Sequence, residues 1–257
     1  LLRAAAKNLP HVLPVPDPQD YDRVLAALRE GGEYHELART LAIKVFRHTA
    51  FYDGLIADFL NRLAAETAEE GVDQEESFAG EFAPVFRRIA ALRYGENPHQ
   101  AGAVYREPLA EPGSLAAAEQ LGGKDLSFNN YNDAEAGLAL VKEFGTTACV
   151  ALKHTSPCGV ALADTPAEAF RRARQADPVS IFGGVVAFNR CVDLETAEEL
   201  TDLFLEIVLA PAFDDEALEL LRNKKKNLRL LQIDLSGKTA DRSPSFDLKR
   251  ISGGLLV

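Results

Sequence analysis

The chain has 257 residues, 47% of them hydrophobic, which is enough apolar material for the core of one large or two ordinary domains. Its formal net charge of -11 argues against a nucleic-acid-binding or membrane-surface role, because both favour a basic exterior. The 3 cysteines have no paired spacing and no apolar stretch reaches the roughly 18 residues of a membrane span, so we expect a reducing, cytoplasmic setting without a disulfide framework or a zinc site.

The first part of the chain has helical patterns. Residues 1–8 are rich in alanine and predict a helical turn or two, and residues 11–15 predict a short apolar strand. Asp17 followed by Pro18 is typical of a helix start, so we expect a helix to about Arg29, ended by the two glycines that follow. Its inward-facing side chains would be Val24, Leu25 and Leu28.

A second helical pattern spans residues 33–63, and Asp53-Gly54 predicts a break that divides it into two helices. Residues 66–80 are acidic and polar with little periodicity, which is typical of a linker. We therefore place a domain boundary there.

Beyond the linker, strand-like segments alternate with helical ones, as they do in α/β sheets. The predicted strands lie at 85–92, 147–152, 185–188, 207–209 and 228–233, and the predicted helices lie at 133–144, after Thr165-Pro166, after Asp193 and at 214–222. A turn at 253–254 would lead into a last strand.

The most informative stretch is 148–159, where an apolar run stops at Lys153 and His154 and Ser-Pro-Cys-Gly at 156–159 predicts a turn. Open α/β sheets usually bind ligands at the carboxyl ends of strands, so the pair predicts a site. A neighbouring ammonium group disfavours protonation of an imidazole, which would let His154 act as a base near neutral pH. A surface Lys-His pair at a strand end is the structural alternative, and the local sequence favours neither.

The loop at 93–100 concentrates polar groups between a glycine and a proline. Arg93 offers a fork for a phosphate or a carboxylate, and Tyr94 can stack on a heterocycle or donate its hydroxyl. The alternative is a polar surface turn in which His99 is incidental.

Two glycine-containing stretches are weaker signals. Residues 122–133 run from paired glycines into a predicted helix, which Asn130, Asn132 or Asp133 could simply cap. Residues 177–184 enter an apolar strand through paired glycines, which suit either the close approach of a ligand or a hairpin or bulge.

Pro157-Cys158 raises the question of a zinc deaminase, since those enzymes use a Pro-Cys-x-x-Cys motif. Ala161 occupies the position of the second cysteine, so this reading fails. Cys158 is then better explained as a small packed residue, while a thiol–imidazole pair with His154 stays open.

Taken together, these stretches resemble one family closely: the bifunctional purine-biosynthesis enzymes that join aminoimidazole-carboxamide ribotide (AICAR) transformylase to inosinate (IMP) cyclohydrolase. The motifs that carry the resemblance follow the family's order and are Leu-Leu-Arg-Ala-Ala-Ala-Lys-Asn at 1–8, Arg-Tyr-Gly-Glu-Asn-Pro-His-Gln at 93–100, Gly-Lys-Asp-Leu-Ser-Phe-Asn-Asn at 123–130, Lys-His-Thr-Ser-Pro-Cys-Gly at 153–159 and Asp-Pro-Val-Ser-Ile-Phe-Gly-Gly at 177–184. Essentially the whole chain is covered. Since the chain also lacks an initiator methionine and ends at a strand start, we expect a fragment of such an enzyme.

The resemblance implies an α/β fold in two parts. Residues 1–65 would be the C-terminal part of the IMP cyclohydrolase domain and would complete a methylglyoxal-synthase-like domain. The acidic linker at 66–80 would lead to 81–257, the N-terminal part of the AICAR transformylase domain, with a cytidine-deaminase-like α/β fold that has lost the zinc ligands. The implied protein is a homodimer with transformylase sites at the subunit interface.

The resemblance also implies chemistry in de novo purine biosynthesis. A formyl group would pass from the co-substrate 10-formyltetrahydrofolate to the 5-amine of AICAR, and the product would then cyclise to IMP with loss of water. No metal is expected. His154 would be the base of the transfer, Lys153 would stabilise the developing charge, and Lys7 would be the catalytic lysine of the cyclohydrolase.

The substrate-binding residues would be Arg93, Tyr94, Gly183 and Glu206, with His99 and Asn130 as further candidates. Human-like family members have Asp at the position of Glu206, so the reach of that contact would differ. Two alternatives remain: a non-catalytic nucleotide-binding α/β module, and a zinc nucleoside deaminase, which the missing Cys-x-x-Cys motif disfavours.

Overall fold

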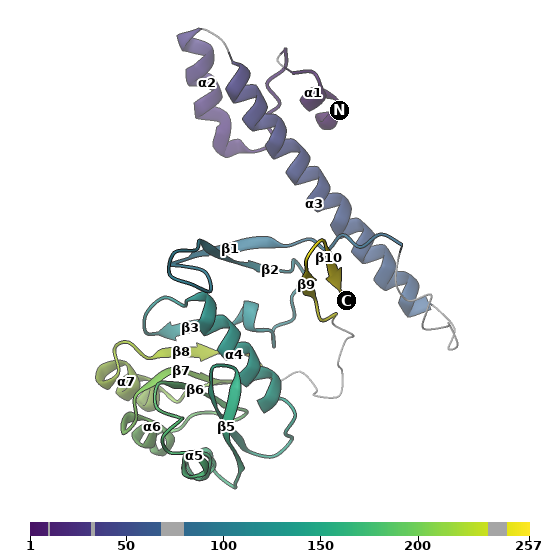
Figure 1. Cartoon of the computed structure of the whole chain (residues 1–257). Coiled ribbons are helices and arrows are strands. Elements are labelled where there is room, and N and C mark those ends of the chain that lie inside the picture. Colours follow the sequence, from purple (N-terminus) through teal and green to yellow (C-terminus); the bar gives the residue numbers. More distant parts are fainter. Residues whose placement is uncertain (10, 32–33, 68–79, 236–245) are drawn as a thin grey trace. The chain divides into compact units, whose positions relative to one another are not determined.

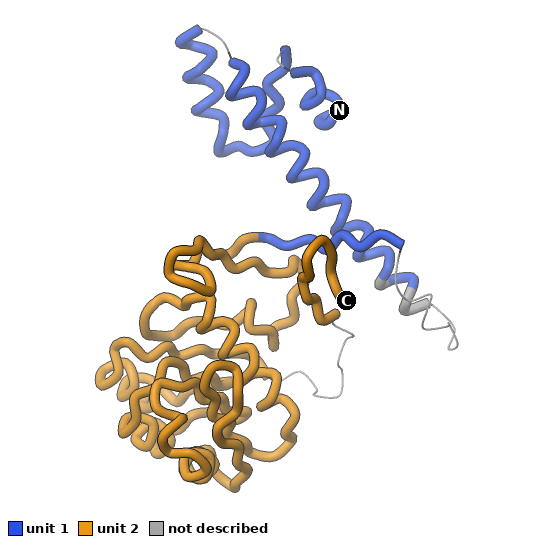
Figure 2. The backbone as a smooth tube through the Cα atoms, in the orientation of Figure 1, with its two compact units in different colours: residues 1–87 blue, residues 88–257 orange. Residues whose placement is uncertain are grey.

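The computed structural model describes residues 1–9, 11–31, 34–67, 80–235 and 246–257. The chain divides into two compact units, Leu1–Arg87 and Arg88–Val257 (Figure 2). The predicted acidic linker at 66–80 lies almost entirely outside the described ranges.

Among the described residues before Arg87, the regular elements of the first unit are all helices (Figure 1). Its elements are α1 (Leu2–Lys7), the 3-10 helix η1 (Pro18–Asp20), α2 (Tyr21–Glu30) and α3 (His35–Thr67). The predicted start at Asp17 is confirmed, since its Oδ1 accepts a hydrogen bond from the Gln19 N–H at 3.0 Å, and Gly31 ends α2 with a φ of +68°.

The predicted strand at 11–15 is wrong. Residues 12–17 have no regular secondary structure, and Pro14 and Pro16 interrupt the segment with two positions that have no N–H to donate to a ladder. The expectation for α2 is right for one of its three residues: Val24 is buried with Leu37 and Leu41, whereas Leu25 and Leu28 are 47% and 52% exposed. The helix therefore buries a narrower stripe than its apolar residues suggested.

The predicted break at Asp53-Gly54 is also wrong, because α3 continues through it. A glycine inside a helix costs about 1 kcal/mol relative to alanine, which neighbouring turns can offset. A Cβ at Gly54 would collide with the side chain of Val85, so close packing explains this glycine better than a helix end does.

The second unit is built on a six-stranded mixed sheet with the strand order β3-β8-β7-β6-β4-β5 (Figure 1). Its strands are β3 (Glu119–Gly122), β4 (Ala148–Lys153), β5 (Ser156–Leu162), β6 (Gly184–Phe188), β7 (Leu205–Ala210) and β8 (Arg229–Gln232). The strands β6, β7 and β8 are parallel, whereas β3, β4 and β5 pair antiparallel to their neighbours. The predicted α/β class is thus confirmed.

Helices cover both faces of this sheet. They are α4 (Phe128–Val141), α5 (Pro166–Ala176), α6 (Leu194–Thr201) and α7 (Asp215–Lys224). Alternate residues of β4 show the two layers: Cys149 and Ala151 pack with Phe170 of α5, while Val150 and Leu152 pack with Leu138 of α4. Since β4 is buried on both faces, its apolar run is a fully covered strand, as predicted.

The turn predicted at 156–159 is misplaced. These residues begin β5, which pairs antiparallel with β4, and the chain turns earlier, at His154 and Thr155. Pro157 is tolerated because β5 is an edge strand. A Cβ at Gly159 would collide with the Ala173 carbonyl of α5, so this glycine permits helix packing and does not mark a turn.

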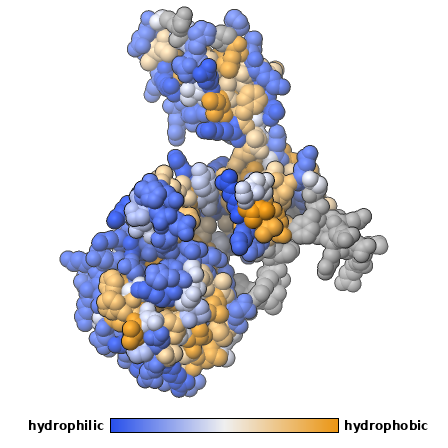
Figure 3. All heavy atoms as spheres, viewed as in Figure 1, coloured by the Kyte–Doolittle hydropathy of each residue, from blue (hydrophilic) through white to orange (hydrophobic). Residues whose placement is uncertain are grey.

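Smaller sheets complete the second unit. The strands β1 (Arg87–Leu92) and β2 (Gly102–Arg106) form one, and β9 (Lys249–Ile251) and β10 (Gly254–Leu256) form the other. The latter confirms the predicted turn and last strand. The face in Figure 3 is mostly hydrophilic, with hydrophobic side chains exposed in several places. None of the helices in the described ranges has the length and hydropathy of a membrane span.

Candidate functional site

The candidate residues of the second unit gather at one end of the six-stranded sheet. The strand β4 runs antiparallel to β6, with Leu152 opposite Val185, so its carboxyl end lies beside the amino end of β6. The amino ends of β7 and β8 follow in the same direction, since both are parallel to β6. Lys153 and His154 therefore lie at the carboxyl end of their own strand, as predicted, but at the amino ends of the parallel strands, where the rule for open parallel sheets does not place a ligand.

Lys153 is the last residue of β4, and its ammonium group is tied to a neighbouring loop. The Nζ donates a hydrogen bond to the Phe182 carbonyl at 2.6 Å. Gly183 follows with a φ of +68°, and a Cβ there would lie 3.0 Å from this Nζ and 3.4 Å from the ring of Phe204. A side chain at Gly183 would thus strain the backbone and press on Lys153.

His154 is exposed and lies in a strained turn. Among the described residues, His154 and Thr155 alone combine a side chain with positive φ, at 52° and 62°. Two-residue hairpin loops of the type I′ family need positive φ at both positions, for which asparagine and glycine are the usual choice. A β-branched residue such as Thr155 is a marked outlier there, and each strained residue costs on the order of 1–3 kcal/mol.

The motif at 123–130 ends in the first turn of α4. Ser127 caps this helix by accepting from the Asn130 N–H at 3.3 Å, and the Asn130 Oδ1 accepts from the Ser127 N–H at 3.1 Å. This reciprocal capping box gives Asn130, which is only 8% exposed, the structural role that the sequence left open. Its role in substrate binding stays a prediction.

The loop between β1 and β2 carries Arg93, Tyr94 and His99. The Arg93 guanidinium lies over the Tyr94 ring, 5.2 Å from its centroid, and both Arg93 and His99 are exposed. The Asn129 amide of α4 donates to the Glu96 carbonyl at 3.2 Å, which ties this loop to the helix. One turn further along α4, Asp133 accepts from the Thr155 N–H at 2.9 Å, so the same helix end contacts the loop and the turn that carries His154.

Glu206 lies on β7 and is held by an arginine of the next strand. The Arg229 guanidinium donates to Glu206 Oε2 at 2.6 Å and to the Asp125 carbonyl at 3.2 Å, and its side chain is only 12% exposed. Asp125 belongs to the stretch at 123–130. Hydrogen bonds thus join the motif at 93–100 to that at 123–130 and the motif at 153–159 to that at 177–184, and Asp133 of α4 links the two pairs.

Cys158 is close to the pair but is not arranged as a nucleophile. Burial raises the pKa of its thiol, although Lys153 opposes the shift, and the Sγ donates to the Ala151 carbonyl at 3.5 Å. The protonated thiol is thus favoured, which supports the packed-residue reading of Cys158.

Lys7 lies in the first unit, at the last position of α1, and is exposed. The preceding Ala6 is buried against Ala42 and Val45 of α3, which fixes the helix that carries the lysine. Nothing in the geometry of α1 alone distinguishes a catalytic lysine from an ordinary surface lysine.

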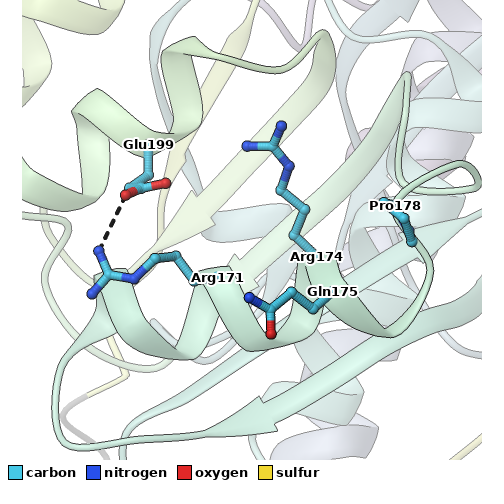
Figure 4. A pocket seen from close by; sticks show the side chains of 5 residues that line it. All are labelled: Arg171, Arg174, Gln175, Pro178 and Glu199. Atoms are coloured by element: carbon cyan, nitrogen blue, oxygen red, sulfur yellow. Dashed lines mark hydrogen bonds and ion pairs between the residues drawn. The ribbon is translucent and has the colours of Figure 1, made fainter.

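A hollow of about 320 Å³ is lined by side chains of α5, of α6 and of the stretch at 177–184 (Figure 4). Its lining residues are Arg171, Arg174, Gln175, Pro178 and Glu199. Ion pairs with Glu168, Glu199 and Glu195 raise the pKa of Arg171, so this guanidinium is already neutralised by carboxylates. None of the candidate site residues lines this hollow. In the described part of the chain, no group of three or more His, Cys, Asp or Glu side chains could hold a metal ion.

A family model described as the AICARFT/IMPCHase bienzyme matches residues 5–257. The chain belongs to this bienzyme family. The bifunctional purine biosynthesis protein PurH of Persephonella marina is 50% identical over 259 residues, which cover 100% of this chain and 48% of the relative. The PurH of Oceanobacillus iheyensis is 47% identical over 257 residues, with the same coverage.

The chain spans about half the length of the curated members of the bienzyme family that it matches. Among solved structures, Acinetobacter baumannii RibD, form 1, has a TM-score of 0.28 and 16% identity, and the match covers 38% of this chain and 32% of that one. This similarity is too low to support an argument about the fold.

Two residues of the site were missed from the sequence. The sequence presents Asp133 only as a candidate helix cap, and nothing in its neighbourhood signals a bond to a turn 22 residues away. Arg229 stands in an apolar strand, where a charged residue could have been noticed as one that needs a buried partner.

Proposed function

We propose that the intact protein carries out the last two steps of IMP formation and that the end of the sheet around Lys153 and His154 is its formyl-transfer site. The observation that supports the proposal is the set of hydrogen bonds that joins these motifs, through Asp133 of α4, at that end of the sheet. An ordinary surface Lys-His pair would not need a strained turn at His154, a hydrogen bond that holds the Lys153 ammonium group and an arginine that holds Glu206.

The transfer needs a base because the 5-amine of AICAR is a poor nucleophile. The amine nitrogen attacks the formyl carbon of 10-formyltetrahydrofolate, and His154 takes the proton that the amine loses. The formyl oxygen gains negative charge as the tetrahedral intermediate forms, and the Lys153 ammonium stabilises that charge. The bond to N10 of the folate then breaks as N10 takes up the proton held by the His154 imidazolium, which releases tetrahydrofolate and formyl-AICAR and restores the neutral imidazole.

The remaining candidates would bind the nucleotide. Arg93 and Tyr94 supply a guanidinium fork and a ring in one loop, while Glu206 supplies a carboxylate and Gly183 leaves room for close approach. His99 is placed in the same loop as Arg93, and Asn130 stands at the start of α4.

The second activity is assigned to the first unit. Lys7 would serve the cyclohydrolase, which closes formyl-AICAR to IMP with loss of water. The same proposal includes a methylglyoxal-synthase-like domain ending near residue 65, a cytidine-deaminase-like domain from residue 81, a homodimer and a cytoplasmic location. Family membership supports these assignments.

The proposal is tested by assaying both steps separately in the complete gene product. His154→Ala should abolish formyl transfer while the ring closure of added formyl-AICAR continues. Lys7→Ala should do the reverse, so that formyl-AICAR accumulates. AICAR binding without any turnover by the wild type would instead support the non-catalytic binding module.

A further inference from the structure

The turn that carries His154 is held from outside by a residue of another element. The Asp133 carboxylate, on the second turn of α4, accepts a hydrogen bond from the Thr155 N–H at 2.9 Å. Asp133 is partly buried, whereas His154 and Thr155 are exposed. The turn is therefore fixed by a contact that neither strand of its hairpin provides.

The geometry of the peptide group shows why this contact matters. The Thr155 N–H belongs to the peptide unit that joins His154 to Thr155, so holding it fixes ψ of His154 and φ of Thr155 together. Both residues have positive φ, which side chains other than glycine adopt only when their surroundings enforce it. Without the Asp133 contact, relaxation of this peptide would reorient the imidazole.

The local contacts of the turn do not replace this one. The Thr155 hydroxyl donates to the His154 carbonyl at 2.7 Å, but that bond joins two neighbouring residues and moves with them. The pairing of Lys153 with Ser156 closes the hairpin without choosing the orientation of the peptide at its tip. The hydrogen bond to Asp133 of α4 does set the orientation of this peptide.

We propose that Asp133 is a positioning residue for formyl transfer, which holds the strained His154–Thr155 peptide so that the imidazole faces the substrate amine. This inference rests on the proposed function of His154. It assigns a role within the reaction to a residue of α4 that does not itself need to touch either substrate.

The test compares variants of the complete gene product in the formyl-transfer assay. Asp133→Ala should lower kcat by about ten- to a hundredfold, the size expected when a reacting group is misplaced by about 1 Å, while KM for AICAR stays the same. Asp133→Asn keeps an acceptor oxygen and should retain most of the rate. Glu135→Ala, which removes an exposed carboxylate two residues along the same helix, is the matched control and should behave as wild type.

A second substitution that relaxes the turn should partly restore the rate that Asp133→Ala loses. Glycine adopts positive φ without an external clamp, so Asp133→Ala/Thr155→Gly should recover part of the rate that Asp133→Ala loses. If Asp133→Ala alone does not fold, the double variant, which lacks the Asp133 contact in a relaxed turn, is compared with Asp133→Asn, which keeps an acceptor oxygen, and the double variant should be the slower of the two.

The outcomes separate this inference from the proposed function. Asp133→Ala at the wild-type rate, or Asp133→Asn as slow as Asp133→Ala, would overturn the positioning role while His154→Ala remained inactive. A His154→Ala variant that transfers formyl groups normally would overturn the proposed function itself.

Discussion

The two ends of the six-stranded sheet are built in opposite ways. At the carboxyl end of β6, the side chain of Asn189 is buried and accepts from the Ala148 N–H at 2.8 Å, while its amide donates to the Phe144 and Thr146 carbonyls at 2.8 and 2.7 Å. At the other end, His154 is exposed in a strained turn and Phe182 is 58% exposed.

We infer from this difference that residues at the Asn189 end mainly stabilise the fold, whereas residues at the His154 end mainly serve the proposed reaction. At the Asn189 end, one buried side chain satisfies the Ala148 N–H and two backbone carbonyls, which stabilises the fold. The end at His154 keeps a strained backbone and accessible polar groups, features that cost stability and that natural proteins retain where they serve a function. Substitutions at the two ends should therefore have opposite effects on rate and stability.

The largest effect is expected at Lys153. Lys153→Ala removes the ammonium group that would stabilise the tetrahedral intermediate, so kcat for formyl transfer should fall by on the order of a hundredfold or more. The free energy of unfolding should change little, because the lysine is only partly buried. Lys142→Ala is the control: its Nζ also donates to a backbone carbonyl, that of Gly113, at 2.6 Å. Equal losses of rate in the two variants would contradict the account.

At the opposite end, Asn189→Ala should mainly reduce stability. It leaves the Ala148 N–H and two carbonyls without their partner, which should lower the free energy of unfolding by about 2–3 kcal/mol. Urea unfolding of the chain measures the loss. The rate per folded molecule should be unchanged, and a slow but stable Asn189→Ala variant would remove the contrast between the two ends.

A smaller effect is expected at Arg229. Arg229→Gln releases the Glu206 carboxylate, so KM for AICAR should rise about tenfold, which corresponds to about 1.4 kcal/mol of binding free energy, while kcat changes little. Arg222→Gln is the matched control, since Arg222 also donates to a backbone carbonyl, that of Leu121, without contacting a candidate residue. An unchanged KM in Arg229→Gln would show that Glu206 does not bind the nucleotide.

The smallest expected effect is on the stability of the fold at acidic pH, through Asp177. Hydrogen bonds from the Ser180 side chain and from the backbone N–H groups of Ser180 and Val179 hold the pKa of Asp177 below its ordinary value of 3.8. A lowered folded-state pKa contributes stability that is present above that value and lost as pH falls through the folded pKa. The stability difference between wild type and Asp177→Asn should be constant at neutral pH and shrink in acid. A difference that grows in acid would contradict this assignment.

The local chemistry of this sequence predicted part of the site. The apolar run before Lys153 encodes a strand buried on both faces, so the pair was correctly expected at the end of a strand. The position of the turn could not be predicted, because positive φ at His154 and Thr155 opposes their intrinsic preferences and depends on Asp133.

Contacts between segments that are far apart in the sequence could not be predicted either. The antiparallel course of β4 decides which end of the sheet receives Lys153, and strand pairing is not encoded locally. Arg229 reaches Asp125 across 104 residues of sequence. In the first unit, packing against Val85 outweighed the helix-breaking tendency of Gly54, and the prolines at 14 and 16 outweighed an apolar pattern.

The most direct test measures formyl transfer and unfolding for His154→Ala and Asn189→Ala in the same complete gene product. For His154→Ala, the account predicts that kcat falls by on the order of a hundredfold or more, as expected for the loss of a general base, and that the free energy of unfolding is unchanged. For Asn189→Ala, it predicts that the free energy of unfolding falls and that the rate per folded molecule is unchanged. Formyl transfer at the wild-type rate by a folded His154→Ala variant would contradict the claim that this end of the sheet is the catalytic one.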